Sequence, residues 1–498
     1  MNQTGAFGMD MESAMPIHYP MAVCDKTVSS ELSGEYLLPD YMTGIRRILT
    51  VDGTALPPSR YVGPSSIELN GTVDHRILYL GEDGGLHTIP MTTEYTLSVP
   101  YDNEHLDMNE GVTVLVSSAC ETPVVRVSGP GRLSLRGRLH THLRAFGCGI
   151  PEEHYSGEMD PSRICRRREE TEAVRMICVT AEPTVLNEEL SGFSEDARIV
   201  SAEASPWLSE TRIENGTLRL NGDLPVRLLI CDRGGRVESV EKRVPFAISA
   251  ECEGADAEWH TDARISVTEL ELTAEEGRIV CTATLVAEAT LMKNLPMVYT
   301  EDLYSTARVC DTEYEDYSLP VVLRAENRSI SQSERIAATD LGIPEGARIL
   351  DARGDVTVEE CSGQGDRLVV MGQSRYRLIW ERDGEYGTAE LTLPMRYETE
   401  GVGDTPKQAD ALCRVALCRA RMDGETACLD AELTVSVSFL GEKTVRAVSG
   451  ASFGELTESG KNRFTVYYPT AGEDRWQVAK RYAVSPDRLT EGNGFFLI

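Results

Sequence analysis

The segment Arg47-Ile48-Leu49, followed by Gly71 and then by Arg76-Ile77-Leu78-Tyr79, recurs twice further along the chain. The other copies are Arg198-Ile199-Val200 with Gly222 and Arg227-Leu228-Leu229-Ile230, and Arg348-Ile349-Leu350 with Gly372 and Arg377-Leu378-Ile379-Trp380. In every copy 24 positions separate the first arginine from the glycine, and successive copies are offset by 151 and 150 residues. A fixed register across distant segments indicates an internal repeat.

The residues after each glycine predict a β-hairpin. In the first copy Val73, Ile77 and Tyr79 fall on one face of an extended strand, and Glu82-Asp83-Gly84-Gly85 supplies the turn, because glycine tolerates positive φ. Later segments of each copy also alternate between apolar and polar residues. The sequence therefore predicts a mainly β chain of three repeated antiparallel β-sandwich or barrel-like domains, followed by a small α+β module.

Domain boundaries are expected where the alternation lapses. The ranges are a disordered N-terminus (1–20), repeats at 21–148, 173–300 and 321–450, linkers at 149–172, 301–320 and 451–461, and the terminal module at 462–498. The basic run Arg163, Arg166, Arg167 and Arg168, followed at once by glutamates, is expected to be solvated linker. Asp404 to Arg419 is the best helical candidate inside a repeat.

Composition excludes several classes of function. The 498-residue chain has a formal net charge of −31, which disfavours binding to nucleic acid and to anionic membrane surfaces. The sequence contains no run of 18 apolar residues, so we expect no membrane span. The first twenty residues lack the basic region that is typical of secretory signals. We therefore expect a cytoplasmic protein. Thirteen cysteines without a CxxC motif fit a reducing compartment, and Cys281 and Cys428 are expected to be small buried hydrophobes.

The last 37 residues differ from the repeats. Phe464 to Tyr468 predicts a strand, and Arg475 to Tyr482 predicts a helix that begins after Asp474. A second helix is expected from Ser485, with Pro486 in its first turn, to near Asn493. Gly494 to Ile498 can form a closing strand.

This tail resembles a LysM module. The matching residues are Gly472-Glu473-Asp474, Trp476, Val478-Ala479, Tyr482, Val484-Ser485, Leu489 and Asn493. LysM modules commonly bind N-acetylglucosamine polymers in a shallow groove between two loops. The candidate residues for binding a partner or a glycan are Gly472, Asp474, Arg475, Trp476, Asp487, Leu489 and Asn493. Core packing is an equally weighted explanation for Trp476.

The repeats resemble the SPOCS domain of spore-coat proteins. The resemblance rests on Leu38-Pro39-Asp40-Tyr41, Ile45, Ile48-Leu49, Val51, Gly71 and Ile77-Leu78-Tyr79, and copies two and three lack the Leu-Pro-Asp-Tyr string. It implies a non-enzymatic scaffold of the spore coat in the mother-cell cytoplasm, at the forespore surface. It further implies that the LysM-like tail docks to a sporulation morphogenetic ATPase of the coat basement layer. The alternative is a peptidoglycan-binding protein that uses the LysM groove.

Motifs for catalysis and cofactor binding are missing from the sequence. It contains neither a GxxxxGK[ST] phosphate loop nor a GxSxG nucleophile elbow. His140 and His142 share one face of a predicted strand, as metal ligands can, with Cys148 as a conceivable third ligand, but surface histidines are the preferred interpretation. We therefore expect no catalytic residue, metal or cofactor. Self-association through exposed strand edges stays open.

Overall fold

The computed structural model describes residues 19–104, 106–107, 111–129, 131–149, 154–275, 277–364, 367–400, 408–457, 465–470, 472–492 and 495–497. The chain is mainly β with antiparallel sheets, which confirms that part of the prediction. Most of the expected disordered N-terminus lies outside the described residues, and Tyr19 and Pro20 already belong to the first strand.

Unit 1 (residues 19–149) forms two sheets. Its strands are β1 (Tyr19–Leu37), β2 (Ile45–Ala55), β3 (Ser59–Val62), β4 (Ser66–Gly81), β5 (Leu86–Pro100), β6 (Val112–Cys120), β7 (Val124–Gly129) and β8 (Arg132–Gly149). In one sheet β8 pairs with β1 and with β6 and β7; in the other, β4 pairs with β5 and with β2 and β3. Leu32, Ile67, Leu97 and Leu139 come from both sheets and belong to one buried cluster, so the sheets enclose a core.

Unit 2 (residues 164–305) repeats this order. A 3-10 turn, η1 (Pro161–Arg163), precedes β10 (Ile164–Thr180), β11 (Thr184–Ser191), β12 (Arg198–Ala204), β13 (Trp207–Glu214), β14 (Thr217–Cys231), β15 (Val237–Glu251), β16 (His260–Glu275) and β17 (Arg278–Ser305). Here β17 is central in one sheet and β14 in the other, as β8 and β4 are in unit 1. Cys281 is buried in the core between these sheets, as predicted.

Unit 3 (residues 308–456) has the same plan with longer strands. They are β18 (Arg308–Ala337), β19 (Arg348–Gln364), β20 (Arg367–Arg382), β21 (Glu385–Glu400), β22 (Gln408–Asp423) and β23 (Thr426–Leu456), with a 3-10 turn, η2 (Ala338–Leu341), after β18. The central strands are β23 and β20, and the short β9 (His154–Gly157) pairs in parallel with β23. Cys428 is buried, again as predicted.

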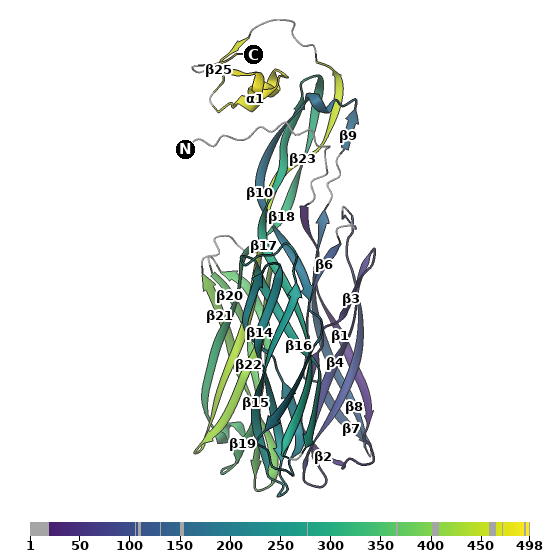
Figure 1. The fold of residues 1–498 in the computed structure, drawn as a ribbon, viewed down its shortest axis with the longest axis vertical. Helices are drawn as coiled ribbons and strands as arrows, with labels where there is room; N and C mark the ends of the chain where they lie inside the picture. The colour runs from purple at the N-terminus through teal and green to yellow at the C-terminus, as the bar shows by residue number, and fades with distance from the viewer. Residues whose placement is uncertain are drawn as a thin grey trace.

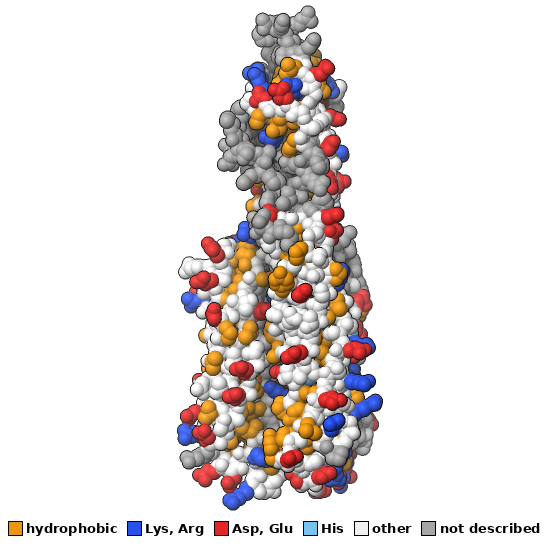
Figure 2. Space-filling view, turned by 90° about the vertical axis from the view of Figure 1, so that its right-hand side faces the viewer, with side chains coloured by type: hydrophobic (Ala, Val, Ile, Leu, Met, Phe, Trp, Pro, Cys, Tyr) orange, Lys and Arg blue, Asp and Glu red, His pale blue; other side chains and the backbone are white. Residues whose placement is uncertain are grey.

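Four long strands of units 2 and 3 extend beyond the two-sheet cores of the units and form a stalk. Residues 164–174 of β10 pair with 294–305 of β17, and residues 308–319 of β18 pair with 443–456 of β23. Leu303, Tyr314, Val448 and Phe453 belong to one apolar cluster that joins the two ladders. Figure 1 shows these strands rising above the bundle of units, with the C-terminal module at their end. Acidic side chains extend over the full height of the face drawn in Figure 2.

The stalk occupies ranges that the sequence predicts to be linkers. β10 begins at Ile164, β17 ends at Ser305, β18 begins at Arg308 and β23 ends at Leu456, so most described residues of these ranges are strand rather than irregular chain. In 308–317 the partly or fully buried positions include Cys310, Thr312, Tyr314 and Tyr317. Cysteine, threonine and tyrosine carry a weaker apolar signal than valine or leucine, and the acidic outer face conceals the alternation. The domain boundaries themselves stay a prediction.

The helix expected at Asp404–Arg419 is wrong for the part of it that the structure describes, which lies in β22. A β-bulge between Val415 and Leu417 shifts the register of β22 against β23. Because of this shift, Cys413 and Cys418 are both buried although they are five residues apart. A strand without a bulge would turn them to opposite faces, so the bulge conceals the period of two that marks a strand.

The three units close into a ring through one repeated arginine. Arg227 Nη1 donates a hydrogen bond to the carbonyl oxygen of Ala352 at 2.6 Å, and Arg377 Nη1 donates to that of Val51 at 2.8 Å. Arg76 Nη1 donates in the same way to the carbonyl oxygen of Ala202. Unit 1 therefore contacts unit 2, unit 2 contacts unit 3, and unit 3 contacts unit 1, each through the same repeat position.

A buried apolar cluster is shared by all three units. Its members at matching repeat positions are Leu78, Leu229 and Ile379, with Val200, Leu350 and the partly buried Leu49, and with Leu86, Val237 and Tyr386. Each unit contributes about a third of this cluster, so separation of any unit from the other two would expose apolar surface to water. The stalk therefore rises from a body in which the units are packed together.

Candidate functional site

The C-terminal module is a short helix packed on a small sheet. Its elements are β24 (Val466–Tyr467), α1 (Arg475–Arg481), the 3-10 turn η3 (Pro486–Arg488), β25 (Thr490–Gly492) and β26 (Phe495–Leu497). The sheet order is β24-β26-β25. Asp474 caps α1, since its side chain accepts a hydrogen bond from the backbone N–H of Gln477 at 2.8 Å while the Gln477 side chain accepts one from the Asp474 N–H. The first strand and first helix therefore lie where the sequence predicts them.

The second predicted helix is a single 3-10 turn. It covers Pro486–Arg488, and the side chain of Ser485 makes no capping hydrogen bond. From Thr490 the chain pairs with β26 instead of continuing a helix. Pairing with the closing strand satisfies backbone groups that a longer helix would have satisfied internally, which explains why the helix stops after one turn.

Trp476 lies in a core that the module shares with the stalk. Its side chain is 6% exposed and packs with Val478, Ala479, Leu489 and Tyr304, the last from β17. The rings of Tyr304 and Trp476 meet edge to face with centroids 5.0 Å apart. Tyr304 also donates a hydrogen bond from its hydroxyl to the carbonyl oxygen of Val484 at 2.7 Å. Trp476 is thus a packing residue between module and stalk.

Asp302 on β17 is the polar centre of this contact. Its carboxylate accepts hydrogen bonds from Trp476 Nε1 at 2.7 Å, from Lys480 Nζ at 2.6 Å and from the Tyr314 hydroxyl at 2.6 Å. Burial opposes ionisation of this carboxyl, but the three hydrogen bonds outweigh burial and hold the pKa of Asp302 below its usual value. A charged Asp302 therefore holds α1 against the stalk.

A second ion-pair network joins the start of α1 to the stalk. Arg167 on β10 lies 3.0 Å from Asp474, 2.8 Å from Glu301 and 3.4 Å from Glu169. The basic run expected to be solvated linker therefore begins a strand, and one of its arginines reaches the cap of the module's helix. These groups are partly exposed, so the network positions the helix more than it stabilises it.

The seven candidate binding residues differ in burial and in their contacts. Trp476 and Leu489 are buried, Arg475 donates a hydrogen bond to the carbonyl oxygen of Leu489, and Asp474 both caps α1 and faces Arg167. Gly472, with φ of +90°, and Asp487 are exposed. Asn493 lies outside the described residues. Whether these residues bind a partner or a glycan stays a prediction.

The sequence does not identify the stalk side of this site. Asp302, Tyr304 and Tyr314 fall in the range 301–320, which the sequence predicts to be a linker rather than a partner of Trp476. Closely spaced tyrosines beside an aspartate are the available signal, because a buried tyrosine needs a hydrogen-bond partner. Lys480 is equally inconspicuous, since a lysine in the last turn of a helix normally faces solvent.

His140 and His142 each interact with a different carboxylate. His140 Nε2 lies 2.6 Å from Glu121, and His142 Nε2 lies 2.8 Å from Asp25. In the described ranges, His, Cys, Asp and Glu side chains form no group of three or more that could hold a metal ion. A helix of sufficient length and apolar character to cross a membrane is also missing from the part of the chain that the structure describes.

The sequence and the structure were compared with known proteins. No protein-family model, curated protein or solved structure matches this chain.

Proposed function

We propose that this protein is a non-enzymatic scaffold of spore-coat assembly, with three SPOCS-like β-sandwich units and a LysM-like module that docks to the morphogenetic ATPase of the coat basement layer. It acts in the mother-cell cytoplasm, at the forespore surface. The motif resemblance in the first repeat and in the tail supports the family. The ring of units also supports a scaffold, because the arginine that recurs in each repeat makes a contact between units.

One observation carries the scaffold proposal: the module is held on the stalk through Trp476 and Lys480 at Asp302. A module on a loose tether samples many orientations, whereas this one has a fixed orientation at the end of a long stalk. Fixing a binding element in advance lowers the entropy lost when a partner binds. Such a design suits a protein that presents one contact surface at a set distance from its body.

The peptidoglycan alternative is less well supported. Asp474 and Trp476, two of the residues proposed to line a glycan groove, are engaged by Arg167 and Asp302 of the same chain. A glycan chain would have to displace these contacts. The side chain of Asp487 is exposed to solvent, and it is the candidate that we assign to the protein partner.

Deletion of residues 462–498 tests the docking role. In a sporulating host, we expect a fluorescent fusion of the truncated protein to stay diffuse in the mother cell instead of gathering at the forespore. The full chain with Asp487→Arg should lose partner binding in a pull-down, while Asp311→Arg, an exposed charge reversal on the stalk, should retain it. Normal localisation of the truncated protein would contradict docking through the tail. Sedimentation of the full chain with insoluble peptidoglycan would favour the alternative.

A further inference from the structure

Strand β7, at the end of the body away from the stalk, is an edge strand (Figure 1). It pairs with β8 on one side, and none of the described strands pairs with its other side. Val124 and Val127 of β7 are 58% and 49% exposed, although Val127 stands opposite the buried Leu133 on the inner face of the sheet. An edge with unpaired backbone groups and exposed valines is a template for a further strand.

The corresponding edges of the other two units are protected. In unit 2 the matching part of β16 carries the exposed Glu269, Glu271 and Glu275, and charges on an edge strand oppose pairing with another chain. In unit 3 β22 lies against β19, so close that a Cβ on Gly354 would stand 3.0 Å from Cγ2 of Val415. The sequence of β7, Val-Val-Arg-Val-Ser-Gly, contains no carboxylate. The open edge is therefore a feature of unit 1.

Arginines gather on the outer face beside this edge. Arg126 on β7 stands opposite Ser134 on β8. Arg132 and Arg136, two positions to either side of Ser134, are its diagonal neighbours on the same face. The residues paired with these arginines across the strands are uncharged, namely Ser33, Leu37, Val124, Gly129 and Ser134. Glu35 on β1 also stands opposite Ser134 and can match one of the three charges, so these rows keep two positive charges in excess.

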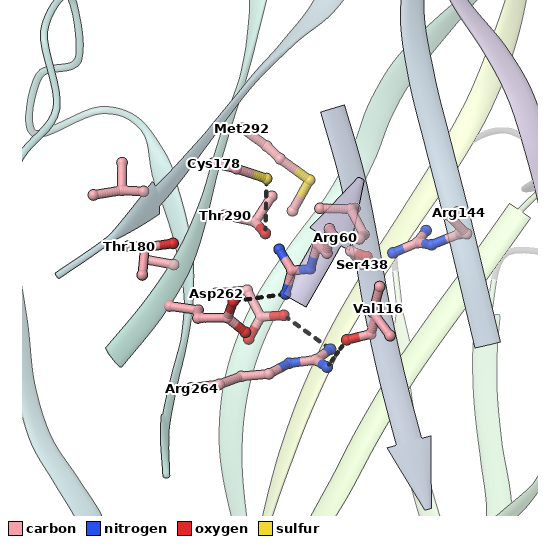
Figure 3. A pocket seen from close by; sticks show the side chains of 14 residues that line it. Arg60, Val116, Arg144, Cys178, Thr180, Asp262, Arg264, Thr290, Met292 and Ser438 are labelled. Atoms are coloured by element: carbon pink, nitrogen blue, oxygen red, sulfur yellow. Dashed lines mark hydrogen bonds and ion pairs between the residues drawn. The ribbon is translucent and has the colours of Figure 1, made fainter. Parts of the chain in front are cut away.

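Arginines between the units are matched instead. Around a cavity of about 40 Å³, Arg60 of unit 1 lies 2.7 Å from Glu288 of unit 2, and Arg264 lies 3.8 Å from Asp262 (Figure 3). These charges belong to contacts within the chain. In a protein with a net charge of −31, an excess of arginine on an outer face favours an acidic ligand by charge complementarity.

Residues 9–15 of the same sequence have the complementary pattern. They read Met9-Asp10-Met11-Glu12-Ser13-Ala14-Met15, and they lie outside the described residues. In an extended strand the three methionines share one face, and Asp10 and Glu12 share the other. Paired with β7, the methionines would cover the valines of the inner face, and the two carboxylates would meet the two positive charges in excess.

This segment cannot reach β7 of its own copy. Tyr19, where β1 begins, pairs with Gly149 at the stalk end of β8. Ser134, opposite Arg126, lies 15 positions before Gly149, which is about 50 Å along a strand. Glu12, at the centre of the segment, is seven positions from Tyr19 and extends at most about 25 Å from it. The acidic strand must therefore come from a second copy.

We propose that residues 9–15 of one copy add as a strand to β7 of a second copy, and that this contact joins copies of the protein. Backbone hydrogen bonds to β7 hold the added strand, and the arginines beside β7 select its acidic face. This surface lies at the opposite end of the body from the C-terminal module, and it does not depend on the partner proposed for that module.

Analytical ultracentrifugation of the full chain over a range of concentrations tests the contact. We expect reversible self-association of the wild type. Arg126→Glu/Arg136→Glu reverses the charge of the acceptor face, and Asp10→Lys/Glu12→Lys reverses that of the added strand. Each double variant should self-associate at least about tenfold more weakly, because like charges then meet across the strands. An equimolar mixture of the two double variants should associate again, because each then offers the other an oppositely charged strand or edge.

Arg212→Glu/Arg219→Glu is the matched control, since it makes the same change of charge at two exposed arginines of unit 2. It should self-associate as the wild type does. A wild type that stays monomeric at every concentration would overturn the proposal, and so would a mixture of the two reversed variants that stays monomeric. If the arginine variant does not fold, Asp10→Lys/Glu12→Lys alone decides, because it leaves all three units unchanged: unaltered self-association contradicts the contact.

Discussion

At the scale of single residues, the repeated arginines and glycines have structural roles that the sequence shows only as spacing. The second arginine of each copy joins that unit to the next, as described above. The glycine of each copy lies where another strand or ring comes close: a Cβ on Gly222 would stand 2.1 Å from the carbonyl oxygen of Trp207, and one on Gly372 would stand 2.2 Å from that of Thr357. These positions are thus fixed by packing between strands and between units.

Removal of one ring arginine should destabilise the whole chain. Arg377 is 9% exposed, and besides Val51 it contacts Asp52 at 2.9 Å. We expect Arg377→Met to lower the free energy of unfolding by about 2 kcal/mol, because the Val51 carbonyl loses its charged donor and the partly exposed Asp52 keeps only Arg353 as a partner. Urea denaturation measures the change. Arg212→Met is the control, with a change within about 0.5 kcal/mol; equal effects would show that the ring contact contributes little.

The contact at Asp302 should depend on pH in the acid range. The pKa of Asp302 lies below its usual 3.8 in the folded chain, so its ionised form stabilises the contact above that pH, and the stabilisation is lost as pH falls through the folded pKa. The NMR resonance of the Trp476 indole N–H should stay constant from pH 7 to about 5 and move only below the usual value. Asp302→Asn should abolish this titration. A midpoint above 3.8 would contradict the proposed charge on Asp302.

Residue types alone could predict one side of the candidate site but not the other. Asp474 as a helix cap and the helix after it follow from local rules, because capping involves residues three positions apart. The partner of Trp476 does not, because Asp302 lies 174 positions away and a long-range contact leaves no local pattern. For the same reason, only the fold shows that Trp476 is a packing residue.

At the scale of elements, alternation in the sequence predicts strands where the buried residues are aliphatic and uninterrupted. It fails in β22, where a bulge changes the phase, and in the stalk, where tyrosine, threonine and cysteine take the inner positions. Element length is also hidden: β18 and β23 run through the predicted boundaries at 320 and 450 without a break. Backbone pairing between strands, rather than composition, sets where these elements end.

Amide hydrogen exchange distinguishes a stalk from a linker. Residues 308–319 pair with 443–456, so those of their amides that donate to β23 should exchange at least about 100-fold more slowly than those of an irregular segment. Residues 101–104, which belong to no strand, provide the reference in the same sample. Exchange of 308–319 as fast as that of 101–104 would show that this stretch is a linker after all.

At the scale of the whole molecule, the shared apolar cluster makes the three units one cooperative body. Leu229 of unit 2 is 1% exposed and packs with residues of units 1 and 3. Cooperative unfolding is expected when the interfaces between units are as apolar and as buried as the cores within them. The sequence predicts three units but not this association, because the shared residues look like ordinary core positions in each copy.

Leu229→Ala tests this cooperativity. We expect the substitution to destabilise the chain by about 3 kcal/mol and to lower a single calorimetric transition without splitting it. Val298→Ala, at an exposed position of the same unit, should leave the transition in place. A variant in which one third of the melting enthalpy moves to lower temperature would show that the units unfold independently.

The polar centre of the ring explains why the three units differ in sequence and lie in one chain. Arg353 of unit 3 contacts Asp52 of unit 1 at 2.6 Å and Glu203 of unit 2 at 3.6 Å, and these three residues occupy the same repeat position. A trimer of identical subunits would place three carboxylates or three guanidiniums together there, with nothing to balance them. Covalent fusion of three diverged copies removes this repulsion and fixes their order, so we expect no single copy to replace the other two.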